Sequence, residues 1–484
     1  MNTEHFDLVV IGGGITGAGV ALDAVTRGMT VALIERNDFA SGTSSKSSKL
    51  VHGGLRYLEN RDLKLVREAV IERDLLVRLA PYLVTTLPFY WPRWAGASRK
   101  AGLGLSIYDS LAGDKGIAKH RSVSADEGAV LLPGASRNSE GYMYYDAQTD
   151  DARLTMAVLR AARIYGAVIC NYVHADEVLS TTDALTAVLA TEKHGDAAMT
   201  ISTSSVVNAT GVWADETRRI EDPSAEIRLQ PSKGVHVVLP HHLLPIASAC
   251  LLPSLTGGLI FAVPWRSSVL VGTTDHDYEG PLDGPLTTEE ESRFLLDSLS
   301  LSFGQDFCLD DTVSSYAGLR PLLSEGKDTE TRDLSRHHKI AAGPQGMLSV
   351  TGGKLTTYRL MAEQVVDRLC DQTGRKVGCR TASLCISNTF DVDGFFKRAN
   401  EMNVSVASCY SLLRSYADVA PEVLTMAQHM DLAAPLVEGL PYLKVEPVWA
   451  MEQEMAITQE DVLARRTRVS LETRVRPEIQ IFSR

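Results

Sequence analysis

The sequence predicts an α/β protein that begins with a Rossmann-like domain, and three observations near the N-terminus support this fold class. A short apolar run at 8–11 leads directly into the glycine pattern Gly12-x-Gly14-x-x-Gly17. Residues 15–28 suit a helix, and residues 30–34 resume strand character before ending at Glu35. A β-α-β unit is therefore complete within about 30 residues, which is the context in which this glycine pattern has structural meaning.

Composition and charge limit the classes of protein that this chain can be. Its 484 residues suggest about three domains, and a hydrophobic content of 44% is sufficient for an ordinary globular core. The formal net charge of −12 argues against general binding of nucleic acid, which needs concentrated positive charge. Seven cysteines without C-x-x-C spacing indicate reduced thiols in a cytoplasmic compartment and no metal centre.

No secretion signal or membrane-spanning helix is predicted. The first seven residues carry acids instead of a basic n-region. Residues 234–265 contain no Asp, Glu, Lys or Arg, but four prolines and the pair Gly257-Gly258 would interrupt a helix there. This stretch is expected to form buried strands and turns.

The remaining elements follow from hydrophobic periodicity. Helices are expected at 62–80, 150–165, 287–302 and 356–372, and strands around 168, at 184–189 and at 201–207. Strands at 233–240, 258–263 and 268–272 predict a mixed or antiparallel second sheet. We therefore expect a discontinuous dinucleotide-binding domain (1–80, 146–230 and 311–384), a substrate-binding domain (81–145 and 231–310) and a helical C-terminal cap domain (385–484).

The glycine pattern predicts a dinucleotide site. Gly12, Gly14 and Gly17 permit a tight turn and the close approach of a pyrophosphate to a helix N-terminus. Glu35 at the end of the second strand can accept hydrogen bonds from a ribose and favours one without a 2′-phosphate. This unit alone does not separate NAD from FAD.

Two later turns favour FAD. A strand at 204–208 enters the small-residue turn Ala209-Thr210-Gly211, of the kind that brings backbone close to a flavin cofactor. A third turn, Gly352-Gly353-Lys354, opens a helix. Its N–H groups and ammonium can stabilise the negative charge that reduction places on a flavin.

The segment 41–58 is the other candidate site. It concentrates hydroxyl groups, cations and the pair Gly53-Gly54 beside His52, Arg56 and Tyr57. Such a segment suits a phosphate-bearing cofactor and an anionic substrate, although a serine-rich stretch is more often a solvated loop.

These blocks resemble the FAD-dependent glycerol-3-phosphate dehydrogenases along nearly the whole chain. The matching motifs are the glycine pattern, TSSKSSKLVHGGLRYLE from Thr43, VNATGVWAD from Val207, KGVHVVLP from Lys233, VGTTD from Val271, AGLRPL from Ala317, TRD from Thr331, GGKLTTYR from Gly352 and EDVLARRT from Glu460. The resemblance implies a glutathione-reductase-like FAD/NAD(P)-binding fold. It also implies oxidation of sn-glycerol 3-phosphate to dihydroxyacetone phosphate, with electrons passing from FAD to a membrane quinone.

Within these motifs, arginines are expected to hold the substrate phosphate, because a guanidinium binds two oxygens at once. The candidates are Arg56, Arg320 and Arg332, with Tyr57 beside them. Together with Lys49 and Lys354 they predict a locally cationic pocket in an acidic protein.

Oxidation of a secondary alcohol also needs a group that accepts the hydroxyl proton. His52 and His236 are the candidate bases, since histidine titrates near neutral pH. Lys354 could instead stabilise the alkoxide or the reduced flavin, and Arg320 is included with the catalytic residues. The residues expected around FAD are Gly12, Gly14, Gly17, Glu35, Thr43, Ser44, Ser45, Ser48, Lys49, Leu50, His52, Gly53, Gly54, Ala209, Gly211, Gly353, Lys354, Leu355 and Thr356.

The electron acceptor remains open at this point. Oxygen is the alternative to quinone, and it would make the protein an oxidase that produces hydrogen peroxide. A non-catalytic flavin-binding regulatory protein and an amine-oxidising flavoenzyme are the alternatives of other classes.

Peripheral association with the inner face of the cell membrane, and a homodimer, are further expectations. Trp91 and Trp94, with Arg93, Arg99 and Lys100, form a candidate interfacial anchor. Arg465, Arg466 and Arg468 either add to a basic face or form ion pairs within the protein.

Overall fold

A six-stranded sheet forms the centre of the dinucleotide-binding unit. The computed structural model describes residues 5–58, 62–113, 116–137, 139–180, 185–226, 228–323 and 337–479. The sheet order is β19 (His338–Ala342), β20 (Leu348–Gly352), β12 (Val206–Asn208), β2 (Leu8–Ile11), β3 (Val31–Ile34) and β8 (Val168–Cys170). All neighbouring pairs are parallel except β19 with β20. The predicted β-α-β unit and the use of distant chain segments in one sheet are confirmed.

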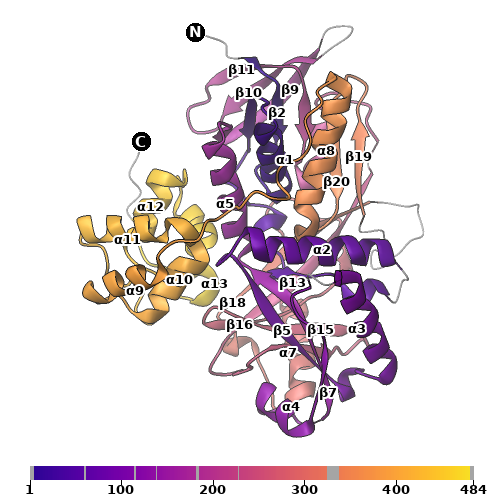
Figure 1. Ribbon diagram of the computed structural model, residues 1–484, viewed down its shortest axis with the longest axis vertical. Helices are drawn as coiled ribbons and strands as arrows, with labels where there is room; N and C mark the ends of the chain where they lie inside the picture. Colours follow the sequence, from indigo (N-terminus) through magenta and orange to yellow (C-terminus); the bar gives the residue numbers. More distant parts are fainter. Residues whose placement is uncertain are drawn as a thin grey trace.

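Three helices pack against this sheet, as Figure 1 shows. They are α1 (Ile15–Thr26), α5 (Asp151–Ile164) and α8 (Tyr358–Thr373), and α1 contacts both of the others. Their apolar side chains and those of β2 and β3 form one buried core. Burial of nearly every residue of α1 explains why its sequence is rich in Gly, Ala and Val.

A four-stranded sheet was not predicted. It consists of β1 (His5–Phe6), β11 (Ala198–Thr203), β10 (Leu185–Glu192) and β9 (Val173–Ser180). The single strand expected at 201–207 is two strands, because β11 ends in this sheet and β12 begins in the six-stranded one. Only Ser204 and Ser205 separate the two strands, so the sequence alone reads as one continuous strand.

The second domain is built on a ten-stranded sheet, which is mixed as expected. Its strands are β4 (Leu50–Val51), β5 (Val84–Pro92), β6 (Arg121–Val123), β7 (Gly141–Thr149), β13 (Leu229–Pro240), β14 (Ala249–Pro253), β15 (Leu259–Trp265), β16 (Ser268–Gly272), β17 (His276–Asp277) and β18 (Ser314–Leu323). The charge-free stretch 234–265 therefore forms strands and turns. In the described parts of the chain, no helix combines the length and the apolarity that crossing a bilayer requires.

Helices α2 (Leu63–Leu79), α3 (Arg99–Ala112), α4 (Ala125–Leu131) and α7 (Glu289–Phe303) complete this part of the molecule, whereas the short helix α6 (Ala214–Arg218) contacts β12 and β20 of the six-stranded sheet. Local sequence explains where the longer ones begin. Asp62 accepts a hydrogen bond from the backbone N–H of Leu65, and Thr288 forms a capping box with Glu291.

The C-terminal region is helical, as predicted, and the structure shows that its helices share an apolar core. It contains α9 (Val392–Glu401), α10 (Val406–Tyr416), α11 (Ala420–His429), α12 (Val445–Gln453), the π-helical turn η10 (Asp461–Arg466) and α13 (Val469–Glu472). In Figure 1 these helices lie beside α5, to the left of the two sheet-based units.

Buried arginines join this region to the rest of the protein. Arg153 of α5 donates to both carboxylate oxygens of Glu454 at 2.7 Å. Arg466 makes a similar pair of bonds to Asp38, at 2.9 Å each, and Arg465 also donates to Asp38. Arg468 binds Asp150 and Asp151. The idea that Arg465, Arg466 and Arg468 form a basic surface is therefore wrong, and the alternative of internal ion pairs is confirmed.

These buried pairs predict a dependence of stability on pH. Burial alone would raise the pKa of Asp150, but Arg468 and Arg266 hold it well below the usual range. Because the pKa is lower in the folded state, the stabilisation is present above about pH 4 and is lost as the pH falls through that region. We expect the melting temperature to fall steeply below pH 4. Asp150→Asn should melt lower at pH 7 and show a shallower acid dependence, and an equal acid slope in the two proteins would contradict this account.

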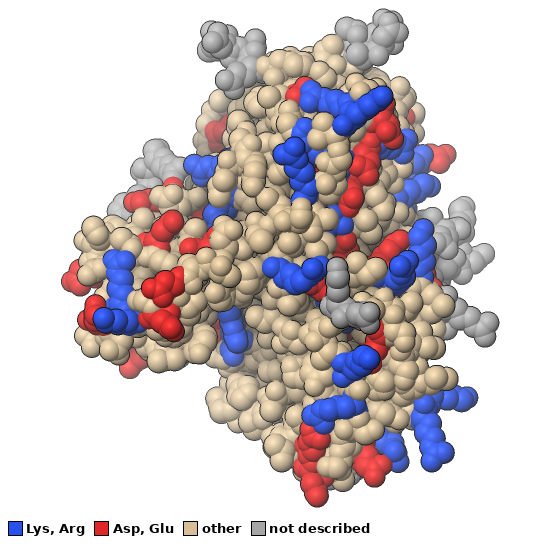
Figure 2. Space-filling view, viewed as in Figure 1, with Lys and Arg blue, Asp and Glu red and all other residues tan. Residues whose placement is uncertain are grey.

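The proposed interfacial anchor differs from the structure at its first tryptophan. Trp91 is buried, and its indole N–H donates to the carbonyl of Ala95 at 2.9 Å. Trp94 is partly buried and packs against two apolar clusters. These two indoles are therefore not available together at a membrane surface. On the face seen in Figure 2, acidic and basic side chains are interspersed among uncharged ones.

Candidate active site

The first glycine turn brings bare backbone to one end of a large cavity. Gly12 has a φ of +114°, and a Cβ at this position would lie 2.7 Å from the carbonyl oxygen of Ala209. A Cβ on Gly17 would overlap the carbonyl oxygen of Gly12. Only glycine fits these positions. Because α1 begins directly after the turn, its first backbone N–H groups are directed toward the cavity.

Glu35 and Ser44 fix the shape of this turn. The partly buried Glu35 carboxylate accepts hydrogen bonds from the backbone N–H of Gly13 at 2.7 Å and of Asn37 at 2.8 Å. Burial raises the pKa of Glu35, and the two backbone donors oppose that shift. The Ser44 hydroxyl accepts from the N–H of Ile15 at 2.9 Å, at the start of α1. The cavity end predicted to receive a ribose and a pyrophosphate is therefore held by side-chain contacts.

The serine-rich segment is an ordered wall of the cavity, not a solvated loop. Thr43 donates to the carbonyl of Leu319 at 2.6 Å, which ties the segment to β18. Ser48 Oγ lies 2.8 Å from His236 Nε2. Ser45 and Lys49 face the other way: the Lys49 ammonium is buried and donates to the Ser45 carbonyl at 2.6 Å and to Asp151 at 2.8 Å.

The third glycine turn also lines the cavity. Gly352 and Gly353 have φ values of +78° and +81°, and Lys354 follows them. The Lys354 ammonium lies 3.6 Å from the centroid of the Tyr57 ring. The Thr356 hydroxyl lies 3.0 Å from the His52 backbone N–H and 3.1 Å from its carbonyl. This turn is thereby joined to the residues 52–57.

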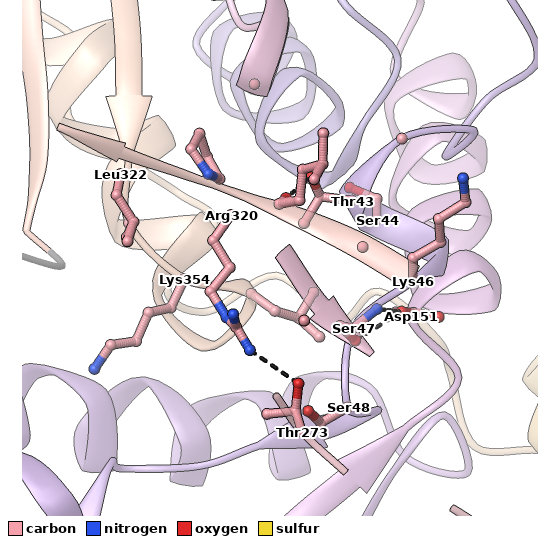
Figure 3. A pocket seen from close by; sticks show the side chains of 18 of the residues that line it. Thr43, Ser44, Lys46, Ser47, Ser48, Asp151, Thr273, Arg320, Leu322 and Lys354 are labelled. Carbon is pink, nitrogen blue, oxygen red and sulfur yellow. Dashed lines mark hydrogen bonds between the residues drawn. The ribbon is translucent and has the colours of Figure 1, made fainter. Parts of the chain in front are cut away.

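Arg320 projects from β18 on the face of the second sheet that lines the cavity. Its Nη1 donates to Asp275 at 3.0 Å and to Ser232 at 3.2 Å, and its Nη2 donates to Thr273 at 3.0 Å. Figure 3 shows the guanidinium directed at Thr273. These contacts fix its orientation in a position that is only 21% exposed.

His236 lies on the same face, four residues after the strand partner of Arg320. In the register of β13 and β18, Ser232 pairs with Arg320 and His236 pairs with Tyr316. The imidazole stacks on Tyr316, with ring centroids 4.8 Å apart. Burial, with smaller contributions from Arg320 and Lys49, lowers the pKa of His236 to about 3. The imidazole is therefore neutral at pH 7, and a pKa this low makes it a weaker base than the near-neutral titration expected from the sequence.

The glycine turns, Arg320 and His236 line one cavity of about 1500 Å³. This exceeds the roughly 300–1,000 Å³ of pockets for drug-sized ligands, so it has room for a dinucleotide and a small second ligand. Most of the predicted site residues line it: Gly12, Gly14, Glu35, Thr43, Ser44, Ser48, Leu50, His52, Gly54, Tyr57, Ala209, Gly211, His236, Arg320, Gly353, Lys354, Leu355 and Thr356.

Four predicted residues stand behind the cavity wall, namely Gly17, Ser45, Lys49 and Gly53. Lys49 is the informative case, because its charge is used internally against Asp151. Gly53 lies against Tyr108 and Val70, where a side chain would not fit. Arg332 and the side chain of Arg56 lie outside the described residues.

The charge of the described lining is mixed, not uniformly cationic. Arg36, Lys46, Arg320 and Lys354 are accompanied by Glu35, Asp146, Asp151, Glu216, Asp275, Glu290 and Glu291. Several of these carboxylates already bind donors in the wall, as Asp146 does with Arg73 at 2.8 Å. The predicted cationic pocket is therefore not uniform, and Arg320 itself pairs with Asp275 at 3.0 Å.

Sequence reasoning missed the residues that orient the others. Thr273 and Asp275 hold Arg320, and both lie within or beside the VGTTD block that carried the family resemblance. Asp151 and Ser47 also line the cavity, and Figure 3 shows the Ser47 side chain directed at Asp151. No local pattern marks Asp151, because its partners are about a hundred residues away.

Comparison with known proteins agrees with this geometry. Residues 7–359 match the model of the FAD dependent oxidoreductase family, and residues 379–478 match the C-terminal domain of alpha-glycerophosphate oxidase. The glycines that leave backbone bare at the cavity, the helix start behind them and the cavity's size fit FAD. Fold and site together define an FAD-dependent oxidoreductase.

Relatives narrow the class further. Glycerol-3-phosphate dehydrogenase 2 of Mycobacterium tuberculosis is 38% identical over 486 residues, covering 98% of this chain and 82% of that protein. The human mitochondrial glycerol-3-phosphate dehydrogenase is 34% identical over 500 residues, covering 97% of this chain and 68% of that protein. The crystal structure of the Bacillus halodurans glycerol-3-phosphate dehydrogenase with FAD superposes with a TM-score of 0.78 at 30% identity, covering 98% of this chain and 88% of that one. The chain belongs to the FAD-dependent glycerol-3-phosphate dehydrogenase family.

Proposed function

We propose that this enzyme oxidises sn-glycerol 3-phosphate to dihydroxyacetone phosphate and passes the electrons to a membrane quinone. The observation that supports the proposal best is the placement of Arg320 and His236 on one sheet face, in the same cavity as the glycine turns. The arginine can hold an anionic group, and the histidine can accept a proton. Glycerol 3-phosphate, the substrate in the names of the relatives, has both a phosphate to be held and a hydroxyl proton to be removed.

Arg320 holds the substrate phosphate in this proposal. Asp275, Ser232 and Thr273 fix the guanidinium before the substrate arrives, so little side-chain entropy is lost on binding. Arg56, Arg332 and Tyr57 complete the phosphate site. An arginine suits this role because its planar fork can bind two phosphate oxygens together.

His236 or His52 accepts the proton of the C2 hydroxyl group. The Ser48 hydroxyl, 2.8 Å from His236 Nε2, orients that imidazole at the cavity wall. When bound, FAD supplies the acceptor for the hydride that leaves C2. Lys354 contributes positive charge on the side of the cavity where electrons accumulate, as its place after a glycine turn and beside Tyr57 allows.

A half-reaction experiment tests the function directly. The purified holoprotein is mixed anaerobically with sn-glycerol 3-phosphate while flavin absorbance is followed, and then receives either a short-chain quinone or oxygen. We expect bleaching with this substrate and rapid recovery with the quinone. Absence of bleaching would refute the dehydrogenase, and faster recovery with oxygen plus stoichiometric hydrogen peroxide would assign the oxidase instead. Peripheral attachment to the inner membrane face and a homodimer accompany the quinone proposal.

Substitution of the two histidines identifies the base. His236→Gln should lower kcat by roughly 10²- to 10⁴-fold with little change in KM, because loss of a positioned base costs that much in typical enzymes. Steady-state kinetics of His236→Gln and His52→Gln, each at matched flavin content, separate the candidates. If His236→Gln retains nearly full kcat while His52→Gln loses it, the role passes to His52.

A further inference from the structure

One arginine of the C-terminal helical region binds residues directly behind the serine-rich wall of the cavity. Arg468 lies between η10 and α13 with a φ of +69°, and its side chain is 2% exposed. Nε donates to the two Asp150 oxygens at 3.0 and 3.1 Å, and Nη2 binds Asp151. Nη1 donates to the carbonyls of Ala464 at 2.7 Å and Ser45 at 3.4 Å. A non-glycine residue in the left-handed region persists where its surroundings over-determine it, as these contacts do.

Asp151 connects this arginine to the serine-rich wall. One carboxylate oxygen, Oδ2, accepts from the Ser47 backbone N–H at 2.9 Å and from the Ser47 hydroxyl at 2.6 Å. The Lys49 ammonium donates to both oxygens, at 2.8 and 3.0 Å. Asp151 thus holds both sides of Ser48, and Arg468 holds Asp151 from behind.

Ser48 and Tyr316 connect the Asp151 contacts to His236 in the cavity. Ser48 Oγ lies 2.8 Å from His236 Nε2, and the Tyr316 hydroxyl donates to the Ser47 carbonyl at 2.8 Å while its ring stacks on His236. A shift of the Ser47–Lys49 backbone therefore moves both neighbours of His236. Ser44, which directly precedes the Ser45–Lys49 segment, accepts a hydrogen bond from the first residue of α1 at the first glycine turn.

We propose that Arg468 is a positioning residue, through which the C-terminal domain fixes the Ser45–Lys49 wall of the FAD cavity by way of Asp151. The domain then has a role in cofactor binding and catalysis, and does more than cover the protein. A displacement of about 1 Å at a reacting centre can cost about 100-fold in rate, which gives the scale of effect that such a residue controls.

Arg468→Gln tests the proposal in the full chain. It is expected to fold, because Lys49 and Arg266 still face the carboxylates of Asp150 and Asp151. We expect the FAD dissociation constant to rise roughly tenfold or more, and kcat to fall by roughly 10- to 100-fold, on the scale seen when orienting partners are removed at metal sites. Arg468→Lys keeps the charge but loses the fork, so it should recover only part of both losses.

A matched control separates positioning from domain attachment. Arg160 also joins α5 to the C-terminal region, through Asp418 at 2.7 Å, and makes no described contact with the Ser45–Lys49 wall. At a temperature where both variants are folded, Arg160→Gln should keep normal FAD affinity and flavin spectrum. Equal FAD losses in Arg160→Gln and Arg468→Gln, or normal FAD affinity and kcat in folded Arg468→Gln, would overturn the proposal.

Ser47→Ala gives an independent test that leaves the domain junction intact. It removes the hydroxyl bond to Asp151 and the bond that the same hydroxyl accepts from the Lys49 N–H at 3.1 Å, so we expect normal thermal stability with a smaller shift in FAD affinity and flavin absorbance. FAD affinity and spectrum are read without substrate, and they distinguish failure of this proposal from failure of the glycerol 3-phosphate assignment. If Arg468→Gln does not fold, a Ser47→Ala protein with unchanged FAD affinity, spectrum and kcat would refute the proposed connection.

Discussion

Arg320→Ala is expected to raise KM for glycerol 3-phosphate by roughly 10- to 100-fold while FAD stays bound. A hydrogen bond to a charged group contributes about 1.5–3 kcal/mol, and each 1.4 kcal/mol changes a dissociation constant tenfold. FAD content should persist, since the guanidinium is held by Ser232, Thr273 and Asp275 of the second sheet, away from the first glycine turn. Steady-state kinetics and the flavin-to-protein absorbance ratio measure the two effects.

Arg121→Ala is the matched control. Arg121 pairs with Glu127 on the surface, and their side chains are 47% and 35% exposed. Such exposed pairs contribute little, so kinetics and flavin content should not change. Normal KM in Arg320→Ala would remove this arginine from the phosphate site and leave Arg56 and Arg332 to hold the substrate.

Gly17→Ala is expected to abolish FAD binding. The added Cβ would overlap the Gly12 carbonyl oxygen, so the turn that receives the pyrophosphate must open. Alanine is otherwise favoured over glycine inside a helix by about 1 kcal/mol, so any loss here comes from the steric conflict. The flavin-to-protein ratio of the purified variant, with far-ultraviolet circular dichroism as the check on folding, measures the result.

Alanine substitutions at two other glycines should have a smaller effect on FAD binding and none, respectively. A Cβ on Gly14 would lie 3.0 Å from Ser44 Oγ, a side chain that can shift, so Gly14→Ala should retain part of the FAD. Gly104 in α3 has open space around its Cβ position, and Gly104→Ala should bind FAD normally. A folded Gly17→Ala protein with full flavin content would refute the close-approach account of this turn.

The sequence predicted the parts of the site whose chemistry is local. The glycine turn, the helix behind it and Glu35 are close neighbours along the chain, so spacing and periodicity suffice to identify them. Arg320 and His236 were identified only through the family resemblance. Their common sheet face depends on the register of β13 against β18, which no pattern within either strand specifies.

Predictions failed where a distant partner decides the role of a side chain. Lys49 has the local context of a ligand-binding cation, but Asp151 takes its charge into the interior. For Arg466 the sequence left a basic face and internal ion pairs open, and the ion pair forms because Asp38, more than four hundred positions earlier, binds it. Trp91 reads as an interfacial aromatic residue, but a hydrogen bond to Ala95 and burial keep it inside. In each case burial of a polar group requires a partner that sequence alone does not name.

The order of strands in the six-stranded sheet also constrains how the protein is made. β2 lies between β3 and β12, and β12 in turn needs β20 as its other neighbour. The glycine turn after β20 follows the first glycine turn by about 340 residues. Because chains emerge from the ribosome N-terminus first, most of the protein must be synthesised before the cofactor can be enclosed. The outer edges of the β2–β3 pair therefore remain unpaired until the later strands β8 and β12 have been synthesised.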